Sequence, residues 1–230
     1  MPGMGIASSV SKRIVNSKLT KAAPDLTNGF VREALKHAIN GAGPLSSAQS
    51  AAEKKLADSH GDVDKAVRSV IDRHAGYAGV EGFVTNLGGL ITAAATIPAN
   101  ITGLAIIQAR MIAVIAALRG YDLDDPKVRN AILLCMLGED PVKKLVKQKK
   151  VPATPMALAT APVHDPDLDR RVAGLVAAEL ISQVGGKRLT STVGRRVPVF
   201  GGVVGLTIDG WSTWRIGRYA SRELRPRARR

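Results

Sequence analysis

The chain has 230 residues, which corresponds to one large domain or two small ones and is long enough to bury a sizeable core. Lysine and arginine together number 33 against 19 aspartates and glutamates, so the formal net charge is +14, which favours an anionic partner. Apolar residues make up 45% of the chain and charged residues only 23%, which excludes disorder over most of it. The single cysteine, Cys135, excludes an internal disulfide framework and a cysteine-rich zinc site.

The N-terminal third predicts a basic arm followed by three amphipathic helices. Residues 1–26 are polar and basic, and we interpret them as an arm. Between residues 27 and 74 apolar residues recur every three or four positions, which is typical of helices that each lay one side on a shared core. Ser46 or Ser47 is expected to cap the second helix and Asp62 the third.

The middle of the chain is unusually apolar. Residues 82–109 contain no charged side chain, and Pro98 divides the run into two expected helices, 84–97 and 99–119. The second would be about 31 Å long, close to the hydrocarbon thickness of a bilayer, but Arg110 lies at its middle. We therefore favour a buried helical hairpin over a transmembrane span. The residues expected to shape this hairpin and its close helix contacts are Gly88, Gly89, Pro98, Asn100, Gly201, Gly202 and Gly205.

The C-terminal half predicts further helices. Asp124 or Asp125 with the proline after it should begin one, and Asp140 should open a short basic one. Residues 151–166 hold four prolines and are interpreted as a linker or exposed loop. A helix begun by Asp167 or Asp169 should then end at the glycine pair 185–186, and a last helix should lead into the basic tail.

No segment shows the alternation of a strand, so the fold class is expected to be all-α. We expect a single multi-helix bundle around the central apolar hairpin. Its organisation would be a basic N-terminal arm at 1–26, a helical domain at 27–222 and a basic C-terminal tail at 223–230.

The sequence motifs of common enzymes do not occur. The chain lacks a nucleotide-binding glycine loop, a nucleophile elbow and a zinc-protease helix motif. The four histidines lie on polar stretches without ligand spacing and are expected at the surface: His37, His60, His74 and His164. We therefore expect a non-enzymatic protein without a metal or cofactor.

Two ionisable residues accompany the apolar runs. Arg110 lies inside the uncharged middle, and Asp209 directly follows the apolar run 197–208. One hypothesis is that they pair inside the core, because a buried charge is tolerated mainly when it is paired. The alternative places Asp209 in solvent or beside Arg215.

Two basic clusters stand out. The first comprises Lys143, Lys144, Lys147, Lys149 and Lys150, and the second begins with Arg215, Arg218 and Arg222 and continues into the tail. Trp211 and Trp214 precede the second cluster, and tryptophan beside arginine suits a membrane interface. Such clusters are also typical of a solvated face, or of a nucleic-acid-binding surface, although no nucleic-acid-binding motif accompanies them.

Several short motifs carry a family resemblance. They are Gly82-Phe83-Val84-Thr85-Asn86-Leu87-Gly88-Gly89, Ile97-Pro98-Ala99-Asn100, Gln108-Ala109-Arg110, Gly120-Tyr121-Asp122, and Pro198-Val199-Phe200-Gly201-Gly202 with Asp209. Across residues 45–222 the chain resembles the EcsC family of bacterial proteins. The resemblance implies no catalytic residues, and it marks Arg110 and the glycines as candidates without a role.

The sequence thus predicts a cytoplasmic, peripheral protein at the inner face of the membrane, since the first 20 residues show no secretory signal pattern. Its basic segments would bind anionic lipid, with the apolar hairpin supplying the core or a lipid-accessible groove. The alternatives are an adaptor for nucleic acid and one for another protein.

Overall fold

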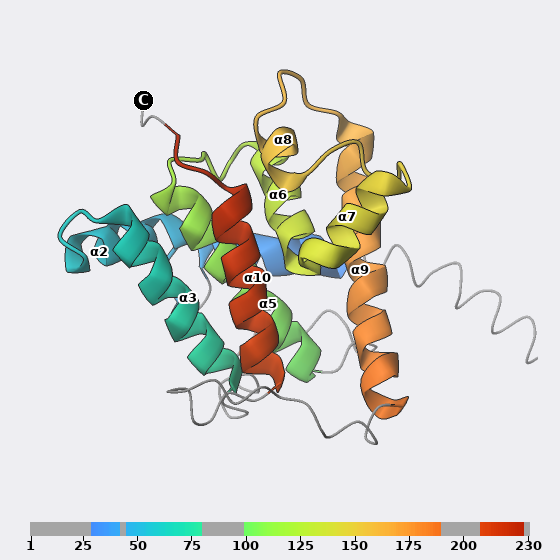
Figure 1. Ribbon diagram of the computed structural model, residues 1–230, viewed down its shortest axis with the longest axis horizontal. Helices are drawn as coiled ribbons and strands as arrows, with labels where there is room; N and C mark the ends of the chain where they lie inside the picture. The colour runs from blue at the N-terminus through green and yellow to red at the C-terminus, as the bar shows by residue number, and fades with distance from the viewer. Residues whose placement is uncertain (1–28, 42–44, 80–98, 190–207, 228–230) are drawn as a thin grey trace, which may run out of the picture.

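The computed structural model describes residues 29–41, 45–79, 99–189 and 208–227, and these ranges form helices and no strand, as the sequence predicted. Residues 29–40 are helical. The remaining elements are α2 (Ala48–Asp58), α3 (Val63–Gly79), α5 (Ala99–Leu118), α6 (Pro126–Leu137), α7 (Glu139–Lys147), α8 (Pro155–Ala159), α9 (Pro166–Leu189) and α10 (Ile208–Glu223). Figure 1 shows α3, α5 and α10 running alongside one another, with α6, α7 and α9 on one flank and α2 on the other.

Three helix starts follow the predicted capping residues. The hydroxyl of Ser47 accepts a hydrogen bond from the backbone N–H of Ser50 at the start of α2. A carboxylate oxygen of Asp62 accepts one from the N–H of Lys65 at 2.9 Å, and Asp125 caps α6 in the same way. Each side chain satisfies a backbone donor that the helix leaves without a partner.

The centre of the bundle is α5. Every residue from Ala105 to Leu118 is buried, and α5 packs against α2, α3, α6 and α10. The prediction that the second half of the apolar hairpin is buried is thereby confirmed, whereas the first half, 84–97, lies outside the described residues. Cys135 of α6 is fully buried in the same core, and burial raises the pKa of its thiol well above the ordinary value.

One glycine sets the distance between α10 and its neighbours. A Cβ atom at Gly217 would lie 2.9 Å from Cγ1 of Ile71 on α3 and 2.9 Å from Sδ of Met111 on α5. Both side chains are fully buried, so they have little room to move. Because glycine has no Cβ, α10 can approach α3 and α5 closely along this line.

Two expectations for the C-terminal half are wrong. The proline-rich stretch 151–166 contains the short helix α8, whose Leu158 and Ala159 are buried against α6. Proline at the first position favours a helix start, and residues 155–159 therefore form a helix on the core instead of an exposed loop. The segment 160–165 after it is a loop that is largely exposed.

The boundaries of α9 also differ from the prediction. It begins at Pro166, and the residue that caps it is Asp165 and not Asp167 or Asp169. The Asp165 carboxylate accepts a hydrogen bond from the backbone N–H of Asp167 at 3.0 Å. The glycine pair 185–186 does not end the helix, which continues to Leu189. A glycine weakens a helix by about 1 kcal/mol, which is too little to end one in every context.

Four helix ends lie at the same edge of the molecule. In Figure 1 the C-terminal ends of α3 and α9 and the N-terminal ends of α5 and α10 all lie at the lower edge. None of the helices in the described ranges has the length and apolarity needed to cross a membrane.

Candidate functional site

The first candidate site is a cavity of about 740 Å³ between α10 and the start of α7, which we call the tryptophan groove. Its α10 wall is formed by side chains spaced three or four residues apart, so that they share one face of the helix. These are Trp211, Trp214, Arg215, Arg218 and Arg222. The other wall includes Leu137, Gly138, Glu139, Asp140 and Pro141. The remaining lining residues are Leu104, Gln108, Asp209, Ser212, Ile216 and Tyr219.

The two tryptophans of the chain form a stacked pair in this groove. Their ring centroids are 5.3 Å apart and the rings are nearly parallel, at 13°. The guanidinium of Arg218 lies 5.7 Å from the centroid of the Trp214 ring, within cation–π distance. Trp211 remains 41% exposed, an uncommon position for so large an apolar side chain.

Ion pairs join the two walls of the groove. Arg215 lies 3.5 Å from a carboxylate oxygen of Asp140, and Arg222 donates a hydrogen bond to Glu139. Lys143 also donates to Glu139, at 2.7 Å, one turn along α7. This hydrogen bond, together with the nearby Arg222, lowers the pKa of Glu139. The acidic start of α7 therefore neutralises two of the three arginines on α10.

The structure gathers the five predicted α10 residues in one place but does not join them to the lysine cluster. Lys144, Lys147, Lys149 and Lys150 are exposed and line neither of the two large cavities, and Lys143 reaches the groove only through Glu139. Asn100 lies in the first turn of α5. Gly88, Gly89, Pro98, Gly201, Gly202 and Gly205 lie outside the described residues.

Arg110 is buried as expected, at 8% exposure, but its partner is not Asp209. Its guanidinium donates to the backbone carbonyl of Ala38 at 3.3 Å and to the hydroxyl of Ser46 at 3.5 Å. It thus contacts the helix at 29–40 and the start of α2, whereas Asp209 lines the tryptophan groove. The hypothesis of a buried pair is wrong, and burial lowers the pKa of Arg110. The suggested partner of Asp209, Arg215, pairs with Asp140.

His74 departs from the expectation that all four histidines lie at the surface. It is only 9% exposed, and its Nδ1 lies 2.8 Å from the carbonyl oxygen of Val70. Burial lowers its pKa from 6.5 to about 4, so the ring is neutral at pH 7. The sequence contained a signal, because His74 follows the core residues Val70 and Ile71 at helical spacing.

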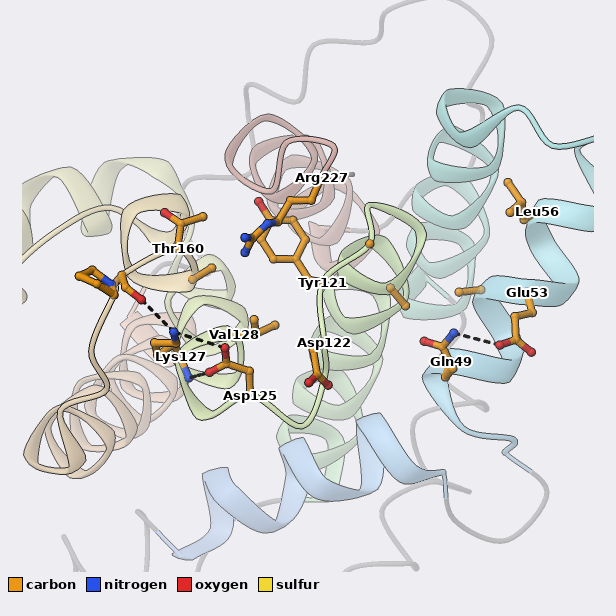
Figure 2. A pocket seen from close by; sticks show the side chains of 16 residues that line it. Gln49, Glu53, Leu56, Tyr121, Asp122, Asp125, Lys127, Val128, Thr160 and Arg227 are labelled. Carbon is orange, nitrogen blue, oxygen red and sulfur yellow. Dashed lines mark hydrogen bonds and ion pairs between the residues drawn. The ribbon is translucent and has the colours of Figure 1, made fainter. Parts of the chain in front are cut away.

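A second cavity, of about 770 Å³, lies at the other end of α5, and we call it the tail cavity. Its lining comes from α2, from the loop after α5, from the start of α6, from the segment after α8 and from Arg227 near the C-terminus (Figure 2). The charged side chains in the lining are Glu53, Asp122, Asp125, Lys127 and Arg227.

Tyr121 and Arg227 meet in the tail cavity. The Arg227 guanidinium lies 5.5 Å from the centroid of the Tyr121 ring, as Figure 2 shows, and the Arg227 backbone N–H donates to the carbonyl of Arg119 at 2.9 Å. Tyr121 is 4% exposed, and its buried hydroxyl has no hydrogen-bond partner in the described part of the chain. Burial raises the pKa of this phenol.

The sequence did not reveal the tail cavity. Asp125 was interpreted as a residue that begins a helix, and Glu53 belongs to an ordinary helix surface. The lining residues extend from Gln49 to Arg227, more than three quarters of the chain, so no local pattern links them. The motif 120–122, which carried part of the family resemblance, is the one signal at this place.

Comparison with protein-family models identifies the chain. The model of the EcsC protein family matches residues 6–228. The chain belongs to the EcsC protein family. The match is wider than the range 45–222 that the motifs suggested, and it includes both cavities of this EcsC protein and most of the tail. No curated protein and no solved structure matches the chain.

Proposed function

We propose that this EcsC protein is a peripheral, non-enzymatic membrane-binding protein that binds anionic lipid at the tryptophan groove. The observation that carries the proposal is the stacked, partly exposed pair Trp211 and Trp214 on the same helix face as Arg215, Arg218 and Arg222. An apolar ring with a polar N–H suits the level of the lipid headgroups, and a guanidinium suits their phosphates.

Electrostatic attraction of the whole chain supports the same proposal. The net charge of +14 draws the molecule toward an anionic surface, and each basic residue near such a surface contributes about 1 kcal/mol. The exposed lysines Lys143, Lys144 and Lys147 belong to α7, whose start forms the other wall of the groove, and Lys149 and Lys150 follow this helix. We propose that they add affinity without specificity.

The position of the groove also supports membrane contact. Trp211 lies in the first turn of α10, at the edge where α3, α5, α9 and α10 have converging ends. The sequences that connect these ends include 82–98 and 197–207, which carry no charged side chain. We propose that this edge faces the lipid, and that the site of action is the inner face of the membrane.

The test is co-sedimentation of the full-length protein with vesicles of phosphatidylcholine alone and with 30% phosphatidylglycerol. We expect binding to the anionic vesicles only, because the arginines need phosphates that lack a neutralising choline. Both tryptophans of the chain line the groove, so their fluorescence should shift to the blue on binding and report on this site directly.

Variants assign the binding to the groove. Trp211→Ala and the double variant Arg215→Ala with Arg218→Ala should each weaken binding at least fivefold. Arg68→Ala is the control, since Arg68 is exposed on α3 and lines neither large cavity. Equal binding to neutral vesicles, or an equal loss with the control, would contradict the proposal.

Nucleic acid is the competing ligand, because bases also stack on tryptophan. A fluorescein-labelled 20-mer of single-stranded DNA, titrated at 150 mM salt, measures this alternative. The proposed ligand would become nucleic acid if two results were found together. The protein would bind the oligonucleotide more tightly than anionic vesicles, and Trp211→Ala would lose the oligonucleotide binding.

A further inference from the structure

Two of the three carboxylates in the tail cavity form no ion pair with any described residue, although the protein is strongly basic. Glu53 accepts a hydrogen bond from the side chain of Gln49 at 2.9 Å, and Asp122 accepts the backbone N–H of Asp124 at 2.8 Å. Neither carboxylate has an ion-pair partner among the residues that the structure describes. This is unusual where basic residues outnumber acidic ones by 33 to 19.

Lys127, the lysine that lines the cavity, already has two partners. The ammonium group of Lys127 donates to the carbonyl of Ala161 at 2.8 Å and lies 3.6 Å from Asp125. Asp125 also accepts the backbone N–H of Lys127 as the cap of α6. Lys127 therefore neutralises Asp125 and leaves the charges of Glu53 and Asp122 available.

Tyr121 supplies an independent sign of a ligand. It lines the cavity, it is almost completely buried, and its hydroxyl has no hydrogen-bond partner among the residues that the structure describes. A buried polar group without a partner is rare in folded proteins and needs an explanation. A ligand that donates a hydrogen bond to it would be one. A phenol oxygen can accept a hydrogen bond from an N–H donor.

A guanidinium already occupies part of the cavity. Arg227 reaches it from the tail, and the described contacts of its guanidinium are limited to the face of the Tyr121 ring. The Arg227 side chain is exposed at the cavity mouth, so it does not fill a space of about 770 Å³. The chain's own Arg227 thus shows that a guanidinium fits in the tail cavity, where the Tyr121 ring holds it by a weak contact.

The same lining does not suit a metal ion. Within the described ranges no group of three or more His, Cys, Asp and Glu side chains is arranged to hold one. A lining that combines carboxylates with an aromatic ring favours an extended organic cation, which can pair with the former and contact the ring face.

We propose that the tail cavity is a binding site for an organic cation carrying a guanidinium or primary ammonium group, and that Arg227 is its intramolecular occupant. The incoming cation displaces the Arg227 side chain from the Tyr121 ring, pairs with Glu53 and Asp122, and donates a hydrogen bond to the Tyr121 hydroxyl. The cation can be a free small molecule or the basic side chain of a peptide.

The test is isothermal titration of the full-length protein with agmatine, which carries one guanidinium and one ammonium group, at 20 mM salt. We expect Arg227→Ala to bind agmatine at least fivefold more tightly than the wild type, because the competing guanidinium is removed. Arg225→Ala is the control, since Arg225 belongs to the same exposed tail and does not line the cavity.

Isosteric variants in the Arg227→Ala background test the carboxylates. Glu53→Gln and Asp122→Asn keep the hydrogen bonds described above, and together they should weaken agmatine binding at least fivefold. Asp58→Asn is the control, because Asp58 is also exposed on α2 but does not line the cavity. Tyr121→Phe, which keeps the ring and removes the hydroxyl, should weaken binding about threefold.

Two further titrants separate the sources of the cation. Butylurea, an uncharged analogue, should not bind. A peptide with the sequence of residues 224–230 should bind the Arg227→Ala protein, and binding of this peptide without binding of agmatine would identify a basic segment as the ligand. No binding of either cation to Arg227→Ala, equal binding of butylurea, or an equal loss with Asp58→Asn would each overturn the proposal.

Discussion

The two cavities of this EcsC protein have opposite charge patterns. The tryptophan groove presents three arginines, of which Glu139 and Asp140 neutralise two, beside exposed aromatic rings. The tail cavity presents two carboxylates, Glu53 and Asp122, that form no ion pair within the described ranges, and its Arg227 guanidinium contacts only a tyrosine ring. The net charge of +14 predicts neither pattern. The difference shows that the local pairing of charges, rather than their sum, determines which ligand a surface of this protein accepts.

The largest effect on both cavities is expected from a change in α10, because this helix forms a wall of the groove and leads to the tail that carries Arg227. Gly217→Val would place side-chain atoms within 3 Å of Ile71 and Met111. We expect a loss of about 3 kcal/mol in the free energy of unfolding and loss of both ligand affinities, because overpacking pushes α10 away from α3 and α5. Urea denaturation measures the free energy of unfolding, and vesicle co-sedimentation and agmatine titration measure the two ligand affinities.

Gly76→Ala is the matched control. Gly76 is a helical glycine of α3, and no atom lies within 4 Å of a Cβ built on it. We expect this variant to gain about 0.5–1 kcal/mol, because alanine favours a helix interior. A destabilised Gly76→Ala or a neutral Gly217→Val would contradict this account of the packing.

The pH dependence of stability tests the core that the two cavities share, through the buried His74. His74 is neutral and buried, with its pKa lowered from 6.5 to about 4, so the unfolded chain binds a proton more readily than the folded one between these values. Its contribution to stability therefore falls as the pH falls. We expect a loss of about 2 kcal/mol between pH 7 and pH 5 that is absent in His74→Leu.

The measurement is urea denaturation at several pH values, with His60→Gln as the control because His60 is exposed. The wild type and His60→Gln should lose stability in parallel, and His74→Leu should lose less. Identical pH dependence in all three would show that His74 is not held neutral in the core.

A charge change at α7 sharpens the contrast between the cavities. Glu139→Gln with Asp140→Asn would release Arg222 and Arg215 from their ion pairs. We expect affinity for vesicles with 30% phosphatidylglycerol to rise about fivefold and affinity for agmatine to stay unchanged. Co-sedimentation and titration check the two results, and an unchanged vesicle affinity would mean that these acids do not compete with phosphate.

The smallest expected effect concerns stability. Arg215 and Asp140 are both well exposed and lie 3.5 Å apart. A double-mutant cycle with alanine at each position should give a coupling free energy of about 0.5 kcal/mol or less, because water and salt screen such pairs. A coupling several times larger would mean that the pair fixes α7 against α10, and the groove would then be rigid.

The local part of the fold could be predicted from the sequence. Ser47, Asp62 and Asp125 act through hydrogen bonds to residues two or three positions away, so the sequence pattern alone contains the cause. The end of α9 could not be predicted in this way. Whether a helix passes through Gly185 and Gly186 depends on packing, which outweighs a propensity difference of about 1 kcal/mol per glycine.

The two candidate sites differ in the same respect. The groove could be predicted in part, because its five α10 residues share one helix face by their spacing. Its acidic wall was missed, since Glu139 and Asp140 reach the arginines only through tertiary contact. The tail cavity and the true partners of Arg110 depend wholly on such contacts between segments far apart in the chain.

The burial of Cys135 has a practical consequence for following both cavities. Because the only thiol of the chain is enclosed by the core and its pKa is raised, maleimides should spare it in the native protein. A cysteine introduced at Lys144 or at Gln49 can then be labelled singly with a spin probe. Probe mobility recorded in the two labelled variants would distinguish a ligand at one cavity from a ligand at the other.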